Sequence, residues 1–189
     1  MYDLTPFALR EVFTWNELIQ LHGIVENLRP TMAPGDVVTE TPQKYDGYRK
    51  SNVLWIPKVP ETDWLYSKLG SIAVTINNTM GWNFNITGMF ENIQIAEYDS
   101  TFQGGYDWHI DVGPDALSKR KISICIQLTH ESEYEGGQLE ISMTREPRVA
   151  SKSFNSGVVF PSFMLHRVTP VTKGRRKSLV LWISGPPFK

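Results

Sequence analysis

The half of the chain after Gly81 consists of short runs of β-branched and aromatic residues separated by Gly, Pro and Asn. Runs of roughly 4–8 such residues are typical of strands, and this punctuation is typical of turns. Many short strands at regular spacing indicate an all-β sandwich or barrel. The expected strands cover residues 90–98, 106–111, 121–128, 138–142, 157–160, 164–170 and 178–184. Hairpin turns are expected at Gly136-Gly137 and at Asn155-Ser156-Gly157.

Two helices are predicted before these strands. Thr14 and Glu17 have the spacing of a capping box, apolar residues then recur every three or four positions, and Pro30 stops the run, which predicts a helix over residues 15–28. A second helix begins at residues 60–63, where a proline, a capping hydroxyl and acidic residues occur together, and it runs to about Thr79.

The remaining N-terminal segments are short. Residues 52–56 predict a strand, and residues 1–13 predict an edge strand or an extended arm. Residues 31–50 contain several turn signals, and we weigh a lid over a substrate groove against an ordinary surface connection.

The order of helices followed by strands predicts a mainly β fold. Both helices carry an apolar stripe, and the sheet is the available surface to cover it. We therefore expect a jelly-roll core with the two N-terminal helices packed on one sheet. Residues 1–189 are predicted to form a single domain, with residues 1–84 as a helical support region and residues 85–187 as the core.

Composition excludes several classes of protein. A net charge of -1 over 189 residues gives no electrostatic case for nucleic acid or an anionic membrane as a partner. The single cysteine, Cys125, excludes an intrachain disulfide and is expected to be a small buried hydrophobe. With neither a signal-peptide pattern nor an apolar run of about 20 residues, the expected location is cytoplasmic.

The chemistry is predicted to lie on two of these strands. Side chains alternate along a strand, so His109 and Asp111 should point to the same face. His166, from a distant strand, would complete a set of two histidines and one carboxylate, the ligand set of non-heme Fe(II) oxygenases. His22 and His130 are expected to be ordinary helix-face and solvated residues.

A cation is predicted at the start of the last strand. Arg176, Ser178 and Trp182 should share one face of this strand, whereas Arg175 should lie on the other face. A guanidinium can bind a carboxylate through two parallel charged hydrogen bonds, so Arg176 is the candidate to hold an anionic co-substrate.

Residues 90–183 resemble the Fe(II)- and 2-oxoglutarate-dependent dioxygenases, within them the prolyl 4-hydroxylase-like branch. The matching segments are residues 97–98, 106–111, 134–139, 158–161 and 166–176, of which the last is the most specific. The resemblance implies a double-stranded β-helix, with His109, Asp111 and His166 as iron ligands.

The same resemblance implies how the co-substrate is held. Arg176 is the expected anchor of 2-oxoglutarate, with Tyr98 and Ser178 as further contacts; the other interpretation of Tyr98 is an ordinary strand aromatic. Ascorbate is a candidate accessory cofactor. Dioxygen and a proline-containing protein or peptide, or free proline, are the implied substrates. Tyr106 is weighed as a substrate-orienting residue, and Gln127 as part of the pocket wall.

Two other functions compete with this interpretation. The first is a non-catalytic metal- or ligand-binding jelly-roll module, which would have no need of a cation at the Arg176 spacing. The second is a zinc hydrolase that uses the same three ligands.

Overall fold

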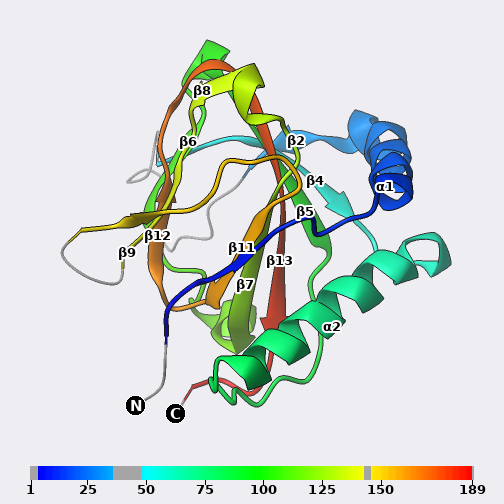
Figure 1. Cartoon of the computed structure of the whole chain (residues 1–189), viewed down its shortest axis with the longest axis vertical. Coiled ribbons are helices and arrows are strands. Elements are labelled where there is room, and N and C mark those ends of the chain that lie inside the picture. The colour runs from blue at the N-terminus through cyan, green and yellow to red at the C-terminus, as the bar shows by residue number, and fades with distance from the viewer. Residues whose placement is uncertain (1–3, 36–47, 143–145, 189) are drawn as a thin grey trace.

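The computed structural model describes residues 4–35, 48–142 and 146–188. Within these residues all the strands pair antiparallel and form two sheets, which face each other as the predicted jelly roll requires (Figure 1). The large sheet has the order β1-β11-β7-β13-β5-β4-β2, with β8 also paired to β13. The small sheet has the order β10-β9-β12-β6-β3.

The large sheet contains most of the long strands. Its members are β1 (Phe7–Leu9), β2 (Ala33–Pro34), β4 (Asn52–Ile56), β5 (Ile93–Asp99), β7 (Arg120–Gln127), β8 (Tyr134–Gly136), β11 (Gly157–Pro161) and β13 (Val171–Ser184). The members of the small sheet are β3 (Arg49–Lys50), β6 (Gly105–His109), β9 (Leu139–Ser142), β10 (Arg148–Val149) and β12 (Leu165–Val168).

The two predicted helices form where the sequence placed them. Helix α1 spans Trp15–Leu28 and has the complete capping box, since Glu17 N donates to Thr14 Oγ1 and Thr14 N donates to Glu17 Oε2. Helix α2 spans Asp63–Thr79 and follows a 3-10 turn, Pro60–Thr62. The Thr62 hydroxyl does not cap α2: it accepts from Val59 N and donates to Pro57 O, so it stabilises the preceding loop.

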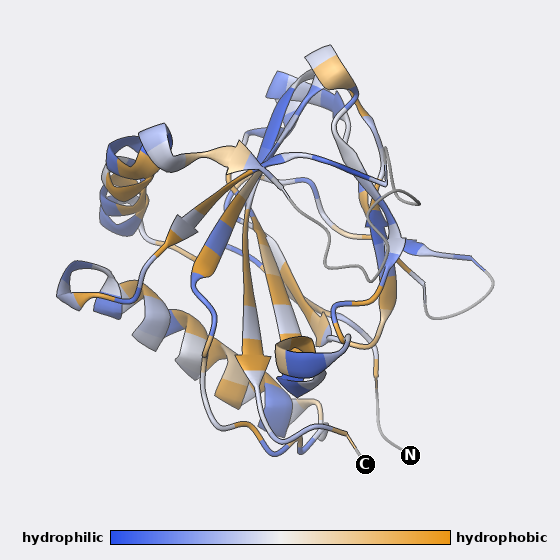
Figure 2. Ribbon diagram, turned by 180° about the vertical axis from the view of Figure 1, so that it is seen from behind, coloured by the Kyte–Doolittle hydropathy of each residue, from blue (hydrophilic) through white to orange (hydrophobic). Residues whose placement is uncertain are grey.

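Both helices lie on one side of the large sheet (Figure 1), which confirms the expected support. Their buried side chains pack on one face of the strands, and orange hydrophobic segments recur along the helices and the central strands (Figure 2). On β13 this face carries Leu179, Leu181 and Ile183, each at most 3% exposed. A fully buried side chain of this size contributes about 1.5–3 kcal/mol, so the helix-facing layer is a large source of stability.

The other face of the large sheet looks toward the small sheet. A second apolar cluster fills part of this space, with residues from β5, β7, β9, β11 and β12. The rest of the interior is a cavity of about 850 Å³, lined by residues of both sheets. The two-layer arrangement therefore encloses a chamber between the sheets, and the helices brace it from outside.

Several local predictions are wrong or incomplete. Gly136-Gly137 is not a hairpin turn, because β8 pairs with β13 whereas β9 pairs with β12. Residues 155–157 do not form one either, because β10 and β11 belong to different sheets. Strand β13 begins at Val171 rather than residue 178. The N-terminal region is more than helical support, since β1 to β4 all come from it.

Residues 31–50, weighed as a lid or as an ordinary surface connection, lie partly outside the described residues. Their described ends include β2 and β3, which join different sheets, and several of these residues line the cavity. Among the described residues, no helix combines the length and the apolar character that a membrane crossing needs.

We expect Asn155→Ala to lower the free energy of unfolding by about 2–4 kcal/mol. Asn155 is buried and has φ 59°. Its Nδ2 donates to Phe13 O (2.7 Å), and its Oδ1 accepts from Phe13 N (2.9 Å). The substitution therefore leaves two backbone groups of Phe13 without a partner and places an alanine in a left-handed conformation. Asn83→Ala is the matched control, since Asn83 has φ 50° but is exposed. Chemical denaturation measures both, and equal losses would contradict a structural role for the buried pair.

Candidate active site

His109 and His166 face each other across two neighbouring strands. They are directly opposed in the β6–β12 pairing, and their ring centroids lie 4.1 Å apart. His109 Nδ1 lies 2.7 Å from Asp107 O, and His166 Nδ1 lies 2.8 Å from Met164 O. A carbonyl oxygen can only accept, so each Nδ1 carries the proton and each Nε2 keeps its lone pair for a ligand.

Asp111 reaches the same point by a route that differs from the prediction. Strand β6 ends at His109, so Asp111 lies two residues beyond it and strand alternation does not orient its side chain. Its backbone N–H donates to Ser162 O (2.9 Å), and its Oδ2 accepts from Ser123 Oγ (2.6 Å). Tertiary hydrogen bonds, rather than the strand, therefore direct this carboxylate.

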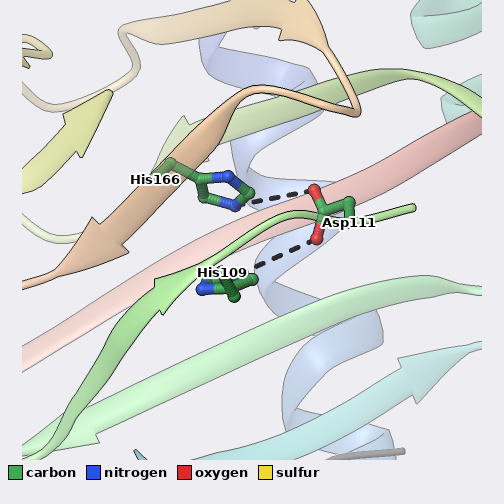
Figure 3. A group of neighbouring side chains, drawn as sticks. All are labelled: His109, Asp111 and His166. Atoms are coloured by element: carbon green, nitrogen blue, oxygen red, sulfur yellow. Dashed lines mark ion pairs between the residues drawn. The ribbon is translucent and has the colours of Figure 1, made fainter. Parts of the chain in front are cut away.

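The three side chains have the separation that one metal ion needs. Their ligand atoms all lie within 4.8 Å of one another, and Figure 3 shows both rings close to the carboxylate. His109 Nε2 is 3.9 Å from Asp111 Oδ1, and His166 Nε2 is 3.6 Å from Asp111 Oδ2. Since bonds from a metal to N or O are about 2.0–2.2 Å, donors roughly 4 Å apart can share an ion. Two neutral imidazoles and one carboxylate fit Fe(II).

Burial keeps this cluster ready to bind a cation. Burial and the neighbouring His166 lower the pKa of His109 to about 4, so its imidazole is neutral near pH 7. Burial pushes the pKa of Asp111 upward, but the two imidazoles, Arg120 and the Ser123 hydroxyl hold it below its usual value. Near pH 7, His109 therefore offers a lone pair and Asp111 a negative charge.

Arg176 lies in the same cavity and is fully buried, with 0% of its surface exposed. Its Nε donates to Gln127 Oε1 (3.1 Å), and its Nη2 lies 3.7 Å from Cys125 Sγ. No carboxylate of the described residues forms an ion pair with it. Arg175 points outward and pairs with Asp99 and Glu97, as the alternation along the strand predicted.

Two polar groups on β13 that line the cavity have atoms left without a partner. Arg176 Nη1 and Ser178 Oγ are buried and make no hydrogen bond to the described part of the protein. Tyr98 is opposite Arg176 in the β5–β13 pairing and lines the cavity, and the guanidinium lies 5.3 Å from its ring centroid. Burial raises the pKa of Tyr98, so its hydroxyl stays protonated and can donate to an anion.

Sequence reasoning missed some residues that shape this pocket. Gly137 has φ 59°, and a Cβ there would lie 3.0 Å from Arg176 Cδ, so a larger residue would displace the arginine. The Gly-Gly pair is the available signal, but on spacing alone it favours a hairpin. Gln127, weighed as part of the pocket wall, does not line the cavity; its Oε1 accepts from Arg176 Nε instead. Cys125 is buried as predicted, but it also contacts the arginine and lines the cavity.

The other candidate residues fall into two groups, those that line the cavity and those that lie outside it. Tyr106 lines the cavity and stacks on His109, with ring centroids 3.5 Å apart, and Trp182 lines the same cavity. His22 and His130 are exposed and outside it.

Comparison with known proteins finds one family to which about half of the chain is similar. Residues 93–184 match the model of the 2OG-Fe(II) oxygenase superfamily. The chain is 32% identical over 124 residues to a PKHD-type hydroxylase of Teredinibacter turnerae, covering 59% of this chain and 55% of the relative. It is 35% identical over 88 residues to one of Colwellia psychrerythraea, covering 45% and 40%. The chain thus spans about half the length of these curated relatives.

Solved structures share the fold over nearly the whole chain. A Pseudomonas putida prolyl-4-hydroxylase has a TM-score of 0.73 at 18% identity, covering 95% of this chain and 91% of that one. A Trichoplax adhaerens prolyl hydroxylase, solved with a hypoxia inducible factor peptide fragment, has a TM-score of 0.78 at 20% identity, covering 96% and 84%. Residues 93–184 are therefore similar to the 2OG-Fe(II) oxygenase superfamily, and the fold of the chain is that of the solved prolyl hydroxylases.

The metal-free protein should lose stability as the pH falls from about 6.5 toward 4. The folded pKa of His109, about 4, is below the ordinary 6.5, so the unfolded chain takes up a proton that the folded chain does not, and acid favours unfolding by up to about 3 kcal/mol. Urea unfolding across this pH range measures the slope. His109→Gln should flatten it and His22→Gln should not; equal slopes in all three proteins would contradict the neutral buried imidazole.

Proposed function

We propose that this protein is an Fe(II)- and 2-oxoglutarate-dependent dioxygenase that hydroxylates a C–H bond, most simply of a prolyl residue in a protein or peptide. One observation carries the proposal: a single cavity contains both a His-Asp-His cluster and a fully buried arginine without a carboxylate among the described residues. A metal site and an anion site in one chamber are what a metal-bound keto acid requires.

His109, Asp111 and His166 are the proposed iron ligands. Three protein ligands leave coordination positions open for a keto acid and dioxygen, and the single carboxylate balances only part of the metal charge. When bound, Fe(II) and 2-oxoglutarate supply the oxidative chemistry, in which dioxygen converts the keto acid to succinate and carbon dioxide while a substrate C–H bond is hydroxylated.

The residues of the chain bind and orient the co-substrate. Arg176 is the proposed anchor of the far carboxylate of 2-oxoglutarate, with Ser178 and Tyr98 as further donors. Burying an unpaired guanidinium costs several kcal/mol, and a carboxylate ligand would offset this cost. Gln127 accepts from Arg176 Nε and so limits how the guanidinium can turn.

The same arginine argues against a passive binding module. A buried cation lowers the stability of the protein when no diacid is bound, and a passive binding module would gain nothing from it. A zinc hydrolase would use the three ligands but would not need this cation at the inner end of the chamber.

The proposed substrate rests on resemblance. Two of the solved proteins that share this fold are prolyl hydroxylases, and one of them was solved with a peptide fragment. Free proline stays an alternative substrate, and ascorbate an accessory reductant. Residues 1–189 as a single domain and the cytoplasmic location stay predictions.

His166→Ala should abolish iron-dependent succinate formation, because the cluster would lose one of two imidazoles. Incubation of iron-loaded protein with 2-oxoglutarate and pools of proline-containing peptides, with succinate and a +16 Da product as readouts, tests the function itself. His22→Gln is the control. Retained turnover in folded His166→Ala would remove His166 from the site, and a wild-type protein without succinate formation in any pool would contradict the function.

Arg176→Ala should raise the 2-oxoglutarate concentration needed for half-maximal succinate formation by roughly 10- to 150-fold, if one to two charged hydrogen bonds are lost. Arg175→Ala is a close control, because its neighbouring guanidinium points outward and pairs with Asp99. If Arg175→Ala has the larger effect, the assignment of the anchor is wrong.

A further inference from the structure

The carboxylate of the cluster is fixed differently from the two imidazoles. Each imidazole sits on a paired strand and donates to a carbonyl two residues earlier. Asp111 lies beyond the end of β6, and its contacts come from other elements. Arg120 Nη1 donates to Asp111 O (3.2 Å) and lies 4.0 Å from Asp111 Oδ1. Asp111 therefore depends on its neighbours for the direction of its side chain.

Arg120 is itself held rigidly. It is the first residue of β7 and is 8% exposed. Its Nε donates to Glu91 Oε2 (2.7 Å), and its Nη2 donates to Glu91 Oε1, so the two planar groups meet as a fork. Its guanidinium also lies 3.7 Å from the centroid of the Trp182 ring. With two nitrogens and one face engaged, Nη1 is left directed at Asp111.

The charge of Arg120 requires this arrangement. A guanidinium 4.0 Å from Asp111 Oδ1 would compete with a cation for that oxygen if it were free to turn. Glu91 binds the other side of the fork and balances the charge. The pair thus supports the backbone of Asp111 while leaving its carboxylate available.

We propose that Arg120, clamped by Glu91 and Trp182, is a positioning residue that fixes the direction in which Asp111 presents its carboxylate to the metal. The inference rests on the proposed function, since it takes Asp111 as a metal ligand. Arg120 acts through the carbonyl of Asp111 and is not itself a ligand.

The test uses Mn²⁺ binding to the metal-free chain of residues 1–189, measured by electron paramagnetic resonance and by calorimetry. Arg120→Gln should weaken the Mn²⁺ Kd about 10- to 100-fold, the usual cost of losing a group that orients a ligand. The spectrum of bound Mn²⁺ should also change, because the carboxylate would take more than one orientation. Glu91→Gln should have the same direction of effect, because it releases Arg120 toward Asp111 Oδ1.

Arg167→Gln is a matched control. Arg167 also pairs with a glutamate, Glu140 (2.7 Å), also lies over a tryptophan, Trp108 (4.7 Å), and is next to His166, but it does not line the cavity. Arg167→Gln should leave the Mn²⁺ Kd and the spectrum of bound Mn²⁺ unchanged. Thermal unfolding of each metal-free variant separates loss of the site from loss of the fold. If Arg120→Gln does not fold, Glu91→Gln and Arg120→Lys carry the test.

Asp111→Ala distinguishes the positioning role of Arg120 from the proposed metal site itself. If it abolishes Mn²⁺ binding while folded Arg120→Gln and Glu91→Gln bind normally, the positioning role is overturned and the metal site stands. Equal weakening by Arg120→Gln and Arg167→Gln also overturns it, because the effect would not be specific to Asp111. If Asp111→Ala binds Mn²⁺ as the wild type does, the proposed ligand set fails.

Discussion

The alternation of side chains along β13 is the constraint on which the rest of this structure depends. Leu179, Leu181 and Ile183 pack against the helix side, whereas Arg176 and Trp182 face the chamber. A slip of one residue in the pairing of this strand would place the guanidinium under the helices and the leucines in the cavity. Burial of the apolar face therefore also fixes where the cation lies, and the energy that stabilises the fold keeps the site in register.

The chamber is polar where an ordinary jelly-roll core would be apolar. A buried arginine, a buried carboxylate, the buried imidazole of His166 and the partly buried imidazole of His109 each carry a desolvation cost. Hydrogen bonds from Ser123, Gln127 and backbone carbonyls recover part of this cost, but several buried donors remain unsatisfied within the described residues. Such a distribution is typical of a site whose ligands complete the network.

Glycines and short polar contacts make this polar interior compatible with close packing. Gly137 lets the chain pass beside the Arg176 stem, and the rigid pair of Arg120 and Glu91 fills the space beside Trp182. These residues do not touch a metal or a keto acid in the proposed mechanism, but they lie beside Asp111 and Arg176, the groups proposed to do so. The support of the site is thus spread over β7, β13, the segment before β5 and the segment between β8 and β9.

The sequence by itself determined the periodic features: both helices, the capping box, the short strands, the outward direction of Arg175 and the inward direction of Arg176. These follow from local spacing, which the order of residues contains. Only the tertiary structure decided the pairing partners of β8 and β10, the contribution of β1 to β4 to the sheets, and the support of Asp111 from Ser123, Ser162 and Arg120. Those contacts join residues far apart in the chain, and their geometry arises only when the two sheets close on each other, so no local pattern records them.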